Sequence, residues 1–554
     1  MVPPHRRFAK WTWPLRALVH AEAFRARPSA YLQGVVWRAR GLKLRARHRF
    51  SALMGQTRHA YELWIAGREP VLHAAIAHQH RGTAALVLVI DCRGADFALV
   101  DQTLTSIEGA EGQPAQIILL GCDPAMARGH GSVADSDALA QQLEEHGTAA
   151  DERLWILAVS AGDRLAAPAL AAYRAALAAA PGAVLFYADD DLIEPSGRRH
   201  SPHFKPHWNP ELFAGHDFLS GSCAFTADPA AVRAAGPDWP RRALPLAGPE
   251  PVHIPLVLHH RGSRPAPRAL HAMQPATLIA DSPHVSIVVP TRNHVALLRT
   301  CMAGLAVTRY PAMDITVIDN GSNEPDTLTY LAELEASGIR ISRQPGPFNY
   351  AAMHNQLVPD LRGPLLCLLN NDIEVIDPDW LAHMVPHALR DDIGAVGARL
   401  LYPDRTIQHA GIVIGVGGGA GHAHRLQPDS APGYFGRAHL PQRVSAVTAA
   451  CLVMRKDRFE AVGGFDAANF TVAFNDVDLC LKLNSAGWHS FYEARACLVH
   501  HESKSRGHDR RGPGRARLAN ELAALKRLWA TDRIHDPFHH PELSQFTEQF
   551  VVRL

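Results

Sequence analysis

The stretch Pro364-Leu365-Leu366-Cys367-Leu368-Leu369-Asn370-Asn371-Asp372 decides how this chain folds. Its five consecutive apolar residues are typical of a strand whose two faces are both covered. The strand runs directly into Asp372, and ligands of open α/β sheets bind at the carboxyl edge of the strands. A lone aspartate after a strand is more often a turn or capping residue. The surrounding sequence must therefore decide what Asp372 does.

Strands and helices alternate around this stretch and again in an earlier region. The predicted strands are 84–90, 117–120, 154–159, 183–187, 285–290, 315–318 and 364–369, and the predicted helices are 97–107, 137–146, 166–179, 294–305 and 325–336. This alternation indicates an α/β fold with mostly parallel sheets and helices on both faces. We expect the strand 183–187 to end on Asp189-Asp190-Asp191, as 364–369 ends on Asn370-Asn371-Asp372. Two such units predict an internal repeat with a period of about 190 residues.

The sequence divides into five parts by composition and pattern. These are a basic, aromatic-rich helical extension at 1–80, a first α/β domain at 81–270, a Pro/Arg/Ala-rich linker at 271–283, a second α/β domain at 284–508 and a helical tail at 509–554. The 554 residues are 47% hydrophobic and 20% charged, which excludes collagen-like, mucin-like and wholly disordered chains. A formal net charge of +2 gives no reason to expect a nucleic-acid partner.

Cysteine usage and hydropathy indicate the compartment. The eight cysteines are scattered and form no CxxC pair, as expected for reduced thiols in a cytosolic protein. No apolar run approaches the roughly 18 residues of a membrane span, and no apolar signal core is found near residue 1. We therefore expect a cytoplasmic protein that neither crosses the membrane nor is exported.

The first 50 residues have a local charge that the whole chain lacks. They contain twelve Lys and Arg residues and one acid, Glu22, interleaved with aromatic residues. A basic, aromatic helical segment can lie on an anionic membrane surface. The alternative is a solvated arm that packs on its own domain. The first interpretation predicts peripheral contact with the inner face of the cytoplasmic membrane.

Five ordered motifs connect the second α/β domain with a known family. They are Val-Ser-Ile-Val-Val-Pro-Thr-Arg-Asn at 285–293, Val-Ile-Asp-Asn-Gly-Ser at 317–322, Asn-Asn-Asp at 370–372, Gly-Gly-Phe-Asp at 463–466 and Asn-Asp-Val-Asp-Leu-Cys-Leu-Lys at 475–482. In order and spacing they resemble the family 2 glycosyltransferases over about 284–508. Within that family the chain looks most like the enzymes of bacterial O-antigen and related polysaccharides, often called rhamnosyltransferase-like.

The resemblance implies a GT-A fold, a nucleotide-diphosphate sugar donor, a divalent metal (Mn2+ or Mg2+), inversion at the anomeric carbon and a glycan or lipid-linked glycan acceptor. Rhamnose is a family-weighted guess for the donor sugar. The residues implied on the nucleotide side are Pro290, Asn293, Asp319, Asn320, Asn371 and Arg506. Asp319 would accept from the base, and Arg506 would face the diphosphate leaving group.

By the same resemblance, Asp372 is the implied metal ligand and His500 completes the metal site. Asp476 matches the general base, although Asn475 stands where the family commonly has Glu. A base at the start of the helix that follows would be kept ionised by the helix dipole. The competing interpretation of Asp476 is ordinary N-terminal helix capping. A glycine-rich run at 415–421 misses the dinucleotide-binding spacing, so we expect no such cofactor there.

The first α/β domain resembles the same family only in part. Tyr-Ala-Asp-Asp-Asp at 187–191 fits, but a short Pro-rich stretch replaces the GGF turn and the base motif. We therefore predict that this first copy is a degenerate GT-A-like domain without catalysis. One alternative is a bifunctional enzyme that uses Asp189 and Asp191. Another is a non-catalytic glycan-binding or scaffold protein built on two decayed transferase domains.

Overall fold

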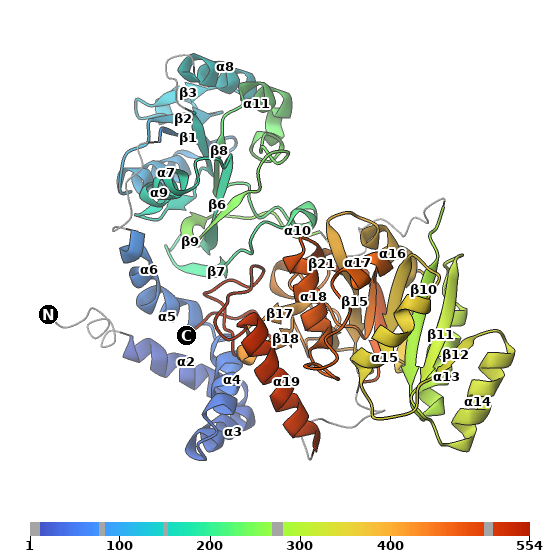
Figure 1. The fold of residues 1–554 in the computed structure, drawn as a ribbon. Helices are drawn as coiled ribbons and strands as arrows, with labels where there is room; N and C mark the ends of the chain where they lie inside the picture. The colour runs from blue at the N-terminus through green and yellow to red at the C-terminus, as the bar shows by residue number, and fades with distance from the viewer. Residues whose placement is uncertain (1–11, 77–83, 148–152, 269–280, 503–512) are drawn as a thin grey trace. The chain divides into compact units, whose positions relative to one another are not determined.

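The computed structural model describes residues 12–76, 84–147, 153–268, 281–502 and 513–554. The chain forms two compact units, drawn in Figure 1. Unit 1 comprises Met1–Ala266 with His540–Ser544 and Val551–Leu554, and unit 2 comprises Pro267–His539 with Gln545–Phe550. The last fifteen residues are thus shared between the two units.

Within the described residues, unit 1 begins with five helices and continues as an α/β sheet. The helices are α2 (Trp13–Ala26), α3 (Pro28–Ala39), α4 (Lys43–Met54), α5 (Ala60–Gly67) and α6 (Glu69–Ile76). The strands are β1 (Leu86–Asp91), β2 (Gln116–Leu120), β3 (Gly131–Val133), β4 (Trp155–Ser160), β5 (Arg164–Leu165), β6 (Leu185–Ile193), β7 (Arg199–His203), β8 (Cys223–Thr226) and β9 (Val252–Arg261). The remaining α-helices are α7 (Phe97–Glu108), α8 (Ser136–Gly147), α9 (Ala169–Ala179), α10 (Pro210–Gly215), α11 (Pro229–Ala235) and α12 (Trp239–Arg242).

Unit 2 contains a second α/β sheet and a long final helix. Its strands are β10 (Val285–Thr291), β11 (Met313–Asp319), β12 (Arg340–Arg343), β13 (Leu365–Leu369), β14 (Ile373–Val375), β15 (Ile393–Leu401), β16 (Ile407–His409), β19 (Gln442–Val444), β20 (Cys451–Arg455) and β21 (His489–His500), with the separate pair β17 (Ile412–Ile414) and β18 (Ala420–His422). Its α-helices are α13 (Val295–Ala306), α14 (Pro325–Ala336), α15 (Tyr350–Leu357), α16 (Trp380–Ala388), α17 (Lys456–Ala461), α18 (Asn475–Ser485) and α19 (Pro513–Trp529).

The two sheets have the same strand order. Unit 1 reads β3-β2-β1-β4-β8-β6-β9-β5, and unit 2 reads β12-β11-β10-β13-β20-β15-β21-β14. The strand directions agree as well: the first four strands of each list are parallel, and the fifth runs antiparallel to both of its neighbours. The expectation of mostly parallel sheets is therefore right for only part of each sheet, and both sheets are mixed.

The central strand of unit 2 explains its uninterrupted apolar sequence. Leu365, Cys367 and Leu369 belong to one buried apolar cluster, whereas Leu366 and Leu368 belong to a second. Successive side chains of a strand point to opposite faces of the sheet. Both faces of β13 are therefore covered, so polar groups can follow only at the end of the strand, where Asp372 lies.

The strand order corrects the predicted repeat. β4 of unit 1 occupies the place of β13, so the residue that corresponds to Asp372 is Asp163, between β4 and β5. Asp189, Asp190 and Asp191 instead lie inside β6, which occupies the place of β15. The prediction that this triplet ends a strand was wrong, because β6 continues through it to Ile193.

Buried cations allow three aspartates to stand within one strand. Lys205 Nζ lies 2.7 Å from Asp190 Oδ2, and both side chains are almost fully buried. Arg199 Nε and His260 Nδ1 lie 2.6 Å and 2.8 Å from the two oxygens of Asp191. A buried carboxylate is costly unless it is paired and hydrogen-bonded. The triplet is thus part of the packing of unit 1.

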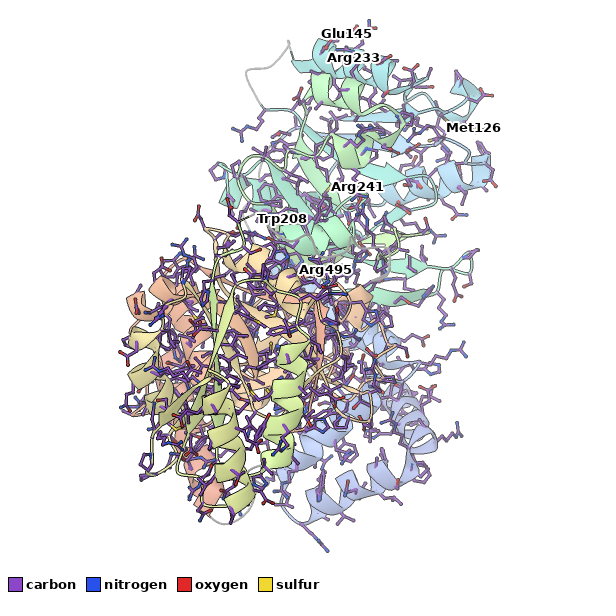
Figure 2. All side chains as sticks on the ribbon, turned by 90° about the vertical axis from the view of Figure 1, so that its right-hand side faces the viewer. Met126, Glu145, Trp208, Arg233, Arg241 and Arg495 are labelled. Carbon is purple, nitrogen blue, oxygen red and sulfur yellow. The ribbon has the colours of Figure 1, made fainter. Side chains whose placement is uncertain are left out.

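Replacing Lys205 by Met should destabilise unit 1, because it leaves Asp190 buried with fewer counter-charges. Breaking a buried ion pair costs about 3–5 kcal/mol, and calorimetric unfolding should show a lower midpoint. The matched control is Arg233→Met on α11 (labelled in Figure 2), where the ion pair with Glu144 is exposed. We expect no change in the control. A Lys205→Met protein as stable as the parent would contradict a structural role for the pair.

Candidate active site

Two adjoining cavities lie at the carboxyl edge of the unit 2 sheet. One, of about 420 Å3, is lined by Asp372, His500 and Asp476 among others. The other, of about 410 Å3, is lined by Pro290 and Asn293 among others. Both cavities are bordered by Tyr350, Asn370 and Asp372. The strand end singled out in the sequence thus forms their common wall. We call them the base-side and the nucleotide-side cavity.

Asp372 and His500 are brought together by strand pairing. Ile373 of β14 pairs with His500 at the end of β21, so the residue before Ile373 meets the histidine ring. His500 Nε2 lies 3.0 Å from Asp372 Oδ1, and both side chains are largely buried. Gln408 on β16 lies on the other side of the ring, with Nε2 2.7 Å from His500 Nδ1. The ring is therefore fixed from two directions.

This pair has the chemistry of a divalent metal site. A carboxylate oxygen and an imidazole nitrogen that border the same cavity suit ions such as Mn2+. To bind a metal through Nε2, His500 must carry its proton on Nδ1. Gln408 allows this, because rotation of its terminal amide presents an oxygen to Nδ1. The donor set of Asp372 and His500 therefore fits the metal that the resemblance implies.

Asp476 lies in the first turn of α18, and its carboxylate is held by backbone groups. Its two oxygens accept hydrogen bonds from the N–H groups of Ala449 (3.2 Å) and Val477 (2.8 Å). Burial raises the pKa of Asp476 above the ordinary value, although these hydrogen bonds oppose the rise. Desolvation is therefore the largest influence on this carboxylate, and it acts against the ionisation that the helix dipole is expected to favour.

A buried glutamate on α19 fixes the loop that precedes Asp476. Glu521 accepts hydrogen bonds from Thr471 Oγ1 at 2.8 Å, Val472 N at 2.9 Å and Ala473 N at 3.2 Å. Val472 and Ala473 line the base-side cavity. Glu521 is 3% exposed. It stands in no recognised motif, so its function as a loop anchor could not be predicted from the sequence.

On the nucleotide side, the backbone after β10 makes an unusual turn. Asn293 and His294 have positive φ angles of 57° and 58°. Asn tolerates this conformation better than most residues. The Asn293 side chain donates to Asn323 Oδ1 at 2.8 Å and accepts from the N–H of Asn323 at 2.8 Å. Asn293 therefore shapes this wall of the cavity by joining two loops.

The other residues implied on the nucleotide side have different surroundings. Asn371 is buried, borders the nucleotide-side cavity and donates to Thr291 Oγ1 at 2.9 Å. Asp319 ends β11 beside Thr291, accepts from the N–H of Ser322 and does not line either cavity. Asn320 donates to the carbonyl of Gln344 at 2.9 Å and does not line them either. Arg506 lies outside the described residues.

Several further ionisable residues also line the cavities. Arg517 of α19 borders the nucleotide-side cavity. His422, Arg425, Glu502 and Glu548 border the base-side cavity. Burial alone would raise the pKa of Glu502, but hydrogen bonds from Tyr402 and Gln408 and the charge of Arg425 lower it instead. The lining of the base-side cavity is thus polar beyond Asp476, which suits hydroxyl groups.

At the corresponding edge of unit 1 a cation lies beside the carboxylate, and His260, the counterpart of His500 by strand pairing, contacts Asp191 instead. Arg261 Nε lies 3.9 Å from Asp163 Oδ2, and the N–H of Gly262 donates to the other oxygen at 2.9 Å. A guanidinium beside the carboxylate repels a divalent metal. Between β8 and β9, unit 1 carries only short helices and no counterpart of the eleven-residue α18.

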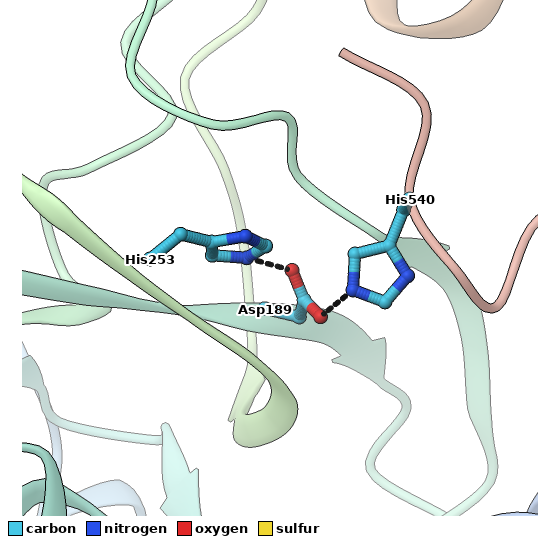
Figure 3. A group of neighbouring side chains, drawn as sticks. All are labelled: Asp189, His253 and His540. Atoms are coloured by element: carbon cyan, nitrogen blue, oxygen red, sulfur yellow. Dashed lines mark hydrogen bonds and ion pairs between the residues drawn. The ribbon is translucent and has the colours of Figure 1, made fainter. Parts of the chain in front are cut away.

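A second cluster of possible metal ligands occurs in unit 1. Asp189 lies between His253, 2.8 Å away, and His540, 2.9 Å away, as Figure 3 shows. The backbone N–H of Glu542 donates to His540 Nδ1 at 3.0 Å. A neutral His540 therefore carries its proton on Nε2, facing Asp189, where a metal ligand needs a lone pair. The side-chain amide of Gln408 can rotate to present an oxygen, whereas the backbone N–H of Glu542 can only donate. The proton of a neutral His540 therefore stays on Nε2.

We therefore interpret this cluster as a structural contact, through which Asp189 holds the segment His540–Ser544 on the rest of unit 1. Burial alone would raise the pKa of Asp189, but His540 and His253 outweigh it and keep that pKa below its ordinary value. Burial lowers the pKa of His253 to about 4. Arg68 and Trp64 hold the same segment through Glu542.

Comparison with known proteins gives one family and several relatives. Residues 286–455 match the model of glycosyl transferase family 2. The chain is 39% identical over 431 residues to the uncharacterized protein y4gI of Sinorhizobium fredii, covering 67% of this chain and 46% of that protein. It is 33% identical over 441 residues to the O-antigen biosynthesis protein RfbC of Myxococcus xanthus, covering 70% and 33%. The chain thus spans less than half the length of these two relatives.

A shorter match and a solved structure complete the comparison. Over 85 residues the chain is 36% identical to the N-acetylglucosaminyl-diphospho-decaprenol L-rhamnosyltransferase of Mycobacterium tuberculosis, covering 15% of this chain and 24% of that one. The mannosyltransferase PcManGT of Pyrobaculum calidifontis, solved with GDP-Man and Mn2+, aligns with a TM-score of 0.35 at 17% identity, covering 48% and 71%. That score is too low to support an argument.

Replacing Glu521 by Ala should free the loop that it anchors. The amides of Val472 and Ala473 lose their acceptor, so their hydrogen exchange should accelerate at least tenfold, and the fold should lose about 1–3 kcal/mol. Arg515→Gln, an exposed change on the same helix, is the control. Unchanged exchange at both amides in Glu521→Ala would show that something else holds the loop.

Proposed function

From the premise that the chain is similar to the family 2 glycosyltransferases over residues 286–455, we propose that unit 2 is an inverting, metal-dependent glycosyltransferase with a GT-A fold. It transfers a sugar, with rhamnose as the first candidate, from a nucleoside-diphosphate donor to a glycan or lipid-linked glycan of a bacterial surface polysaccharide. The observation that carries the proposal is that Asp372, His500 and Asp476 border one cavity, which adjoins the nucleotide-side cavity at Asp372.

The donor occupies the nucleotide-side cavity in this proposal. Pro290, Asn293 and Asn371 shape the wall around the nucleotide, and Asp319 and Asn320 support that wall from the neighbouring strand. Arg517 supplies a positive charge at the same cavity, as Arg506 is expected to do. Asp372 and His500 would hold a divalent cation, which neutralises the negative charge that develops on the departing diphosphate.

Asp476 acts as the general base on the opposite side of the sugar. The acceptor hydroxyl oxygen forms a bond to the anomeric carbon while the bond from that carbon to the diphosphate oxygen breaks. Asp476 takes the proton of the hydroxyl. A raised pKa suits this role, because a base is most effective when its pKa approaches the working pH. Attack from the side opposite the leaving group inverts the anomeric configuration.

Unit 1 is proposed as a non-catalytic copy of the same fold. The shared strand order supports a common GT-A-like template. Arg261 beside Asp163, and the lack of a counterpart of α18 among the described residues, argue against a second transfer site there. The contacts of Asp189 and Asp191 with buried cations and histidines speak against the bifunctional alternative as well.

A donor screen tests the proposal. Purified protein is incubated with a panel of nucleotide sugars and Mn2+, Mg2+ or EDTA, and release of nucleoside diphosphate is measured. We expect metal-dependent release from one donor, reduced at least a hundredfold in Asp476→Asn and in Asp372→Ala. Asp189→Asn is the matched change in unit 1 and should leave turnover per folded molecule unchanged.

Two outcomes of the screen would overturn the proposal. Release that continues in EDTA and in Asp372→Ala would exclude the metal role. No release with any donor, together with no nucleotide binding by calorimetry, would favour the scaffold alternative. If a nucleotide binds but no nucleoside diphosphate is released, the assay is repeated with a lipid-linked glycan acceptor. No release in that assay would contradict sugar transfer.

The pH dependence should report the raised pKa of Asp476. The base works only when ionised, so kcat/KM should fall as the pH drops through its pKa, which lies above the value of about 3.9 for an ordinary aspartate. An acid limb at or below that ordinary value would contradict the assignment.

The same shift predicts a stability change with the opposite sign. A pKa higher in the folded than in the unfolded chain means that the ionised carboxylate destabilises the fold at neutral pH. Asp476→Asn should therefore unfold at a slightly higher temperature than the parent at pH 7.5, although it is inactive. A lower midpoint would indicate that the carboxylate serves mainly as a structural hydrogen-bond acceptor.

A further inference from the structure

The hairpin formed by α3 and α4 exposes a concentration of large apolar side chains. Eight of the eighteen such side chains found exposed among the described residues fall between 13 and 44. Five belong to the hairpin and its turn, and they are Leu32, Val35, Val36, Leu42 and Leu44. Leu44 is 58% exposed and Leu32 is 53% exposed. Single exposed apolar residues are normal, but a cluster of this kind marks an interaction site.

The apolar side chains point away from the packed side of the hairpin. On α3, Leu32, Val35 and Val36 are spaced i, i+3 and i+4, which places them on one helix face. Gly34 lies on the opposite face and is buried, and a Cβ at that position would meet the ring of Phe50 of α4 at 3.1 Å. Figure 1 shows α3 and α4 side by side. The exposed stripe is thus directed outward.

The same arrangement holds on α4. Its buried residues, Ala46 and Leu53, lie two turns apart on one face. Leu44 precedes Ala46 by two residues, or about 200° around the helix, so it lies on the other face. The hairpin thus exposes apolar side chains on both helices and, at Leu42, in the turn between them. We call these five residues the apolar patch of the hairpin.

Basic residues alternate with the apolar patch. Arg38, Arg40, Lys43, Arg45 and Arg47 all fall within the same sixteen residues, 32–47, which contain no acid. The nearest acid in sequence, Glu22, accepts from His59 Nδ1 at 2.6 Å. The whole chain carries a formal charge of only +2, so this charge is local. A partner must therefore offer negative charge and an apolar interior together.

We infer that the α3–α4 hairpin binds the surface of an anionic lipid bilayer. The leucines and valines enter the boundary between headgroups and acyl chains, while the arginines and the lysine contact lipid phosphates. A nucleic acid would satisfy the charge but leave the apolar patch in water. The inference does not depend on the proposed transferase activity, because it rests on unit 1 alone.

Vesicle flotation of the full chain tests this inference. We expect at least tenfold more protein with phosphatidylcholine vesicles that contain 30% phosphatidylglycerol than with pure phosphatidylcholine, and less binding at high salt. The triple variant Leu32→Ser/Val36→Ser/Leu44→Ser and the triple variant Arg38→Gln/Arg40→Gln/Lys43→Gln should each lose binding at least tenfold. These side chains are exposed, so both variants should fold, which circular dichroism checks. Val307→Ser, an exposed change in unit 2, is the control.

Each contrary outcome identifies a different error. No binding to anionic vesicles overturns the inference, and so does binding that survives both triple variants. Loss in the charge variant alone would mean that the apolar side chains do not enter the bilayer and serve another partner, such as a protein. Nucleoside-diphosphate release from the donor screen is measured without vesicles, so failure of one proposal is distinguishable from failure of the other.

Discussion

A charged side chain buried in either sheet must meet a counter-charge or border a cavity, and this constraint shapes both units. The strands of unit 2 are covered on both faces, so its polar groups gather at the carboxyl edge, where Asp372 and Asp476 border a cavity. Unit 1 has the same strand order but meets its buried carboxylates with its own cations, as Lys205 and Asp190 show. The same strand order thus gives unit 2 a sheet edge that is open to a ligand, and unit 1 a sheet whose carboxylates are neutralised by its own cations.

The sequence predicted the strands and helices well where apolar runs end at proline, glycine or polar residues. The prediction placed the acidic triplet 189–191 at the end of a strand, because the apolar run 183–187 does not show whether the strand stops there or continues. Partners outside the strand, such as Lys205 and His540, stabilise the charges inside β6, and the pattern of the run does not reveal them. The antiparallel β8 and β20 were not predicted either, since direction in a sheet depends on connections that local patterns do not record.

The candidate site was predictable where residues stand in recognisable motifs. Asp372, His500 and Asp476 lie far apart in sequence and border one cavity. Glu521 and Gln408 could not be found in this way, because each is a single polar residue whose role comes from tertiary contacts. The upward shift in the pKa of Asp476 could not be read from the sequence for a similar reason. A helix start can be read from sequence, but the burial that raises the pKa cannot.

Asp163 shows how different partners change the carboxylate at this edge of the sheet. Arg261 lies beside it, yet at 3.9 Å it neutralises the carboxylate incompletely, and burial still raises the pKa of Asp163 to about 6. A folded-state pKa above the unfolded value makes the ionised carboxylate unfavourable to folding at neutral pH. Both oxygens of Asp163 nevertheless accept backbone N–H groups, from Gly262 and Ser160. The carboxylate that borders a cavity in unit 2 is thus met in unit 1 by donors of the unit itself.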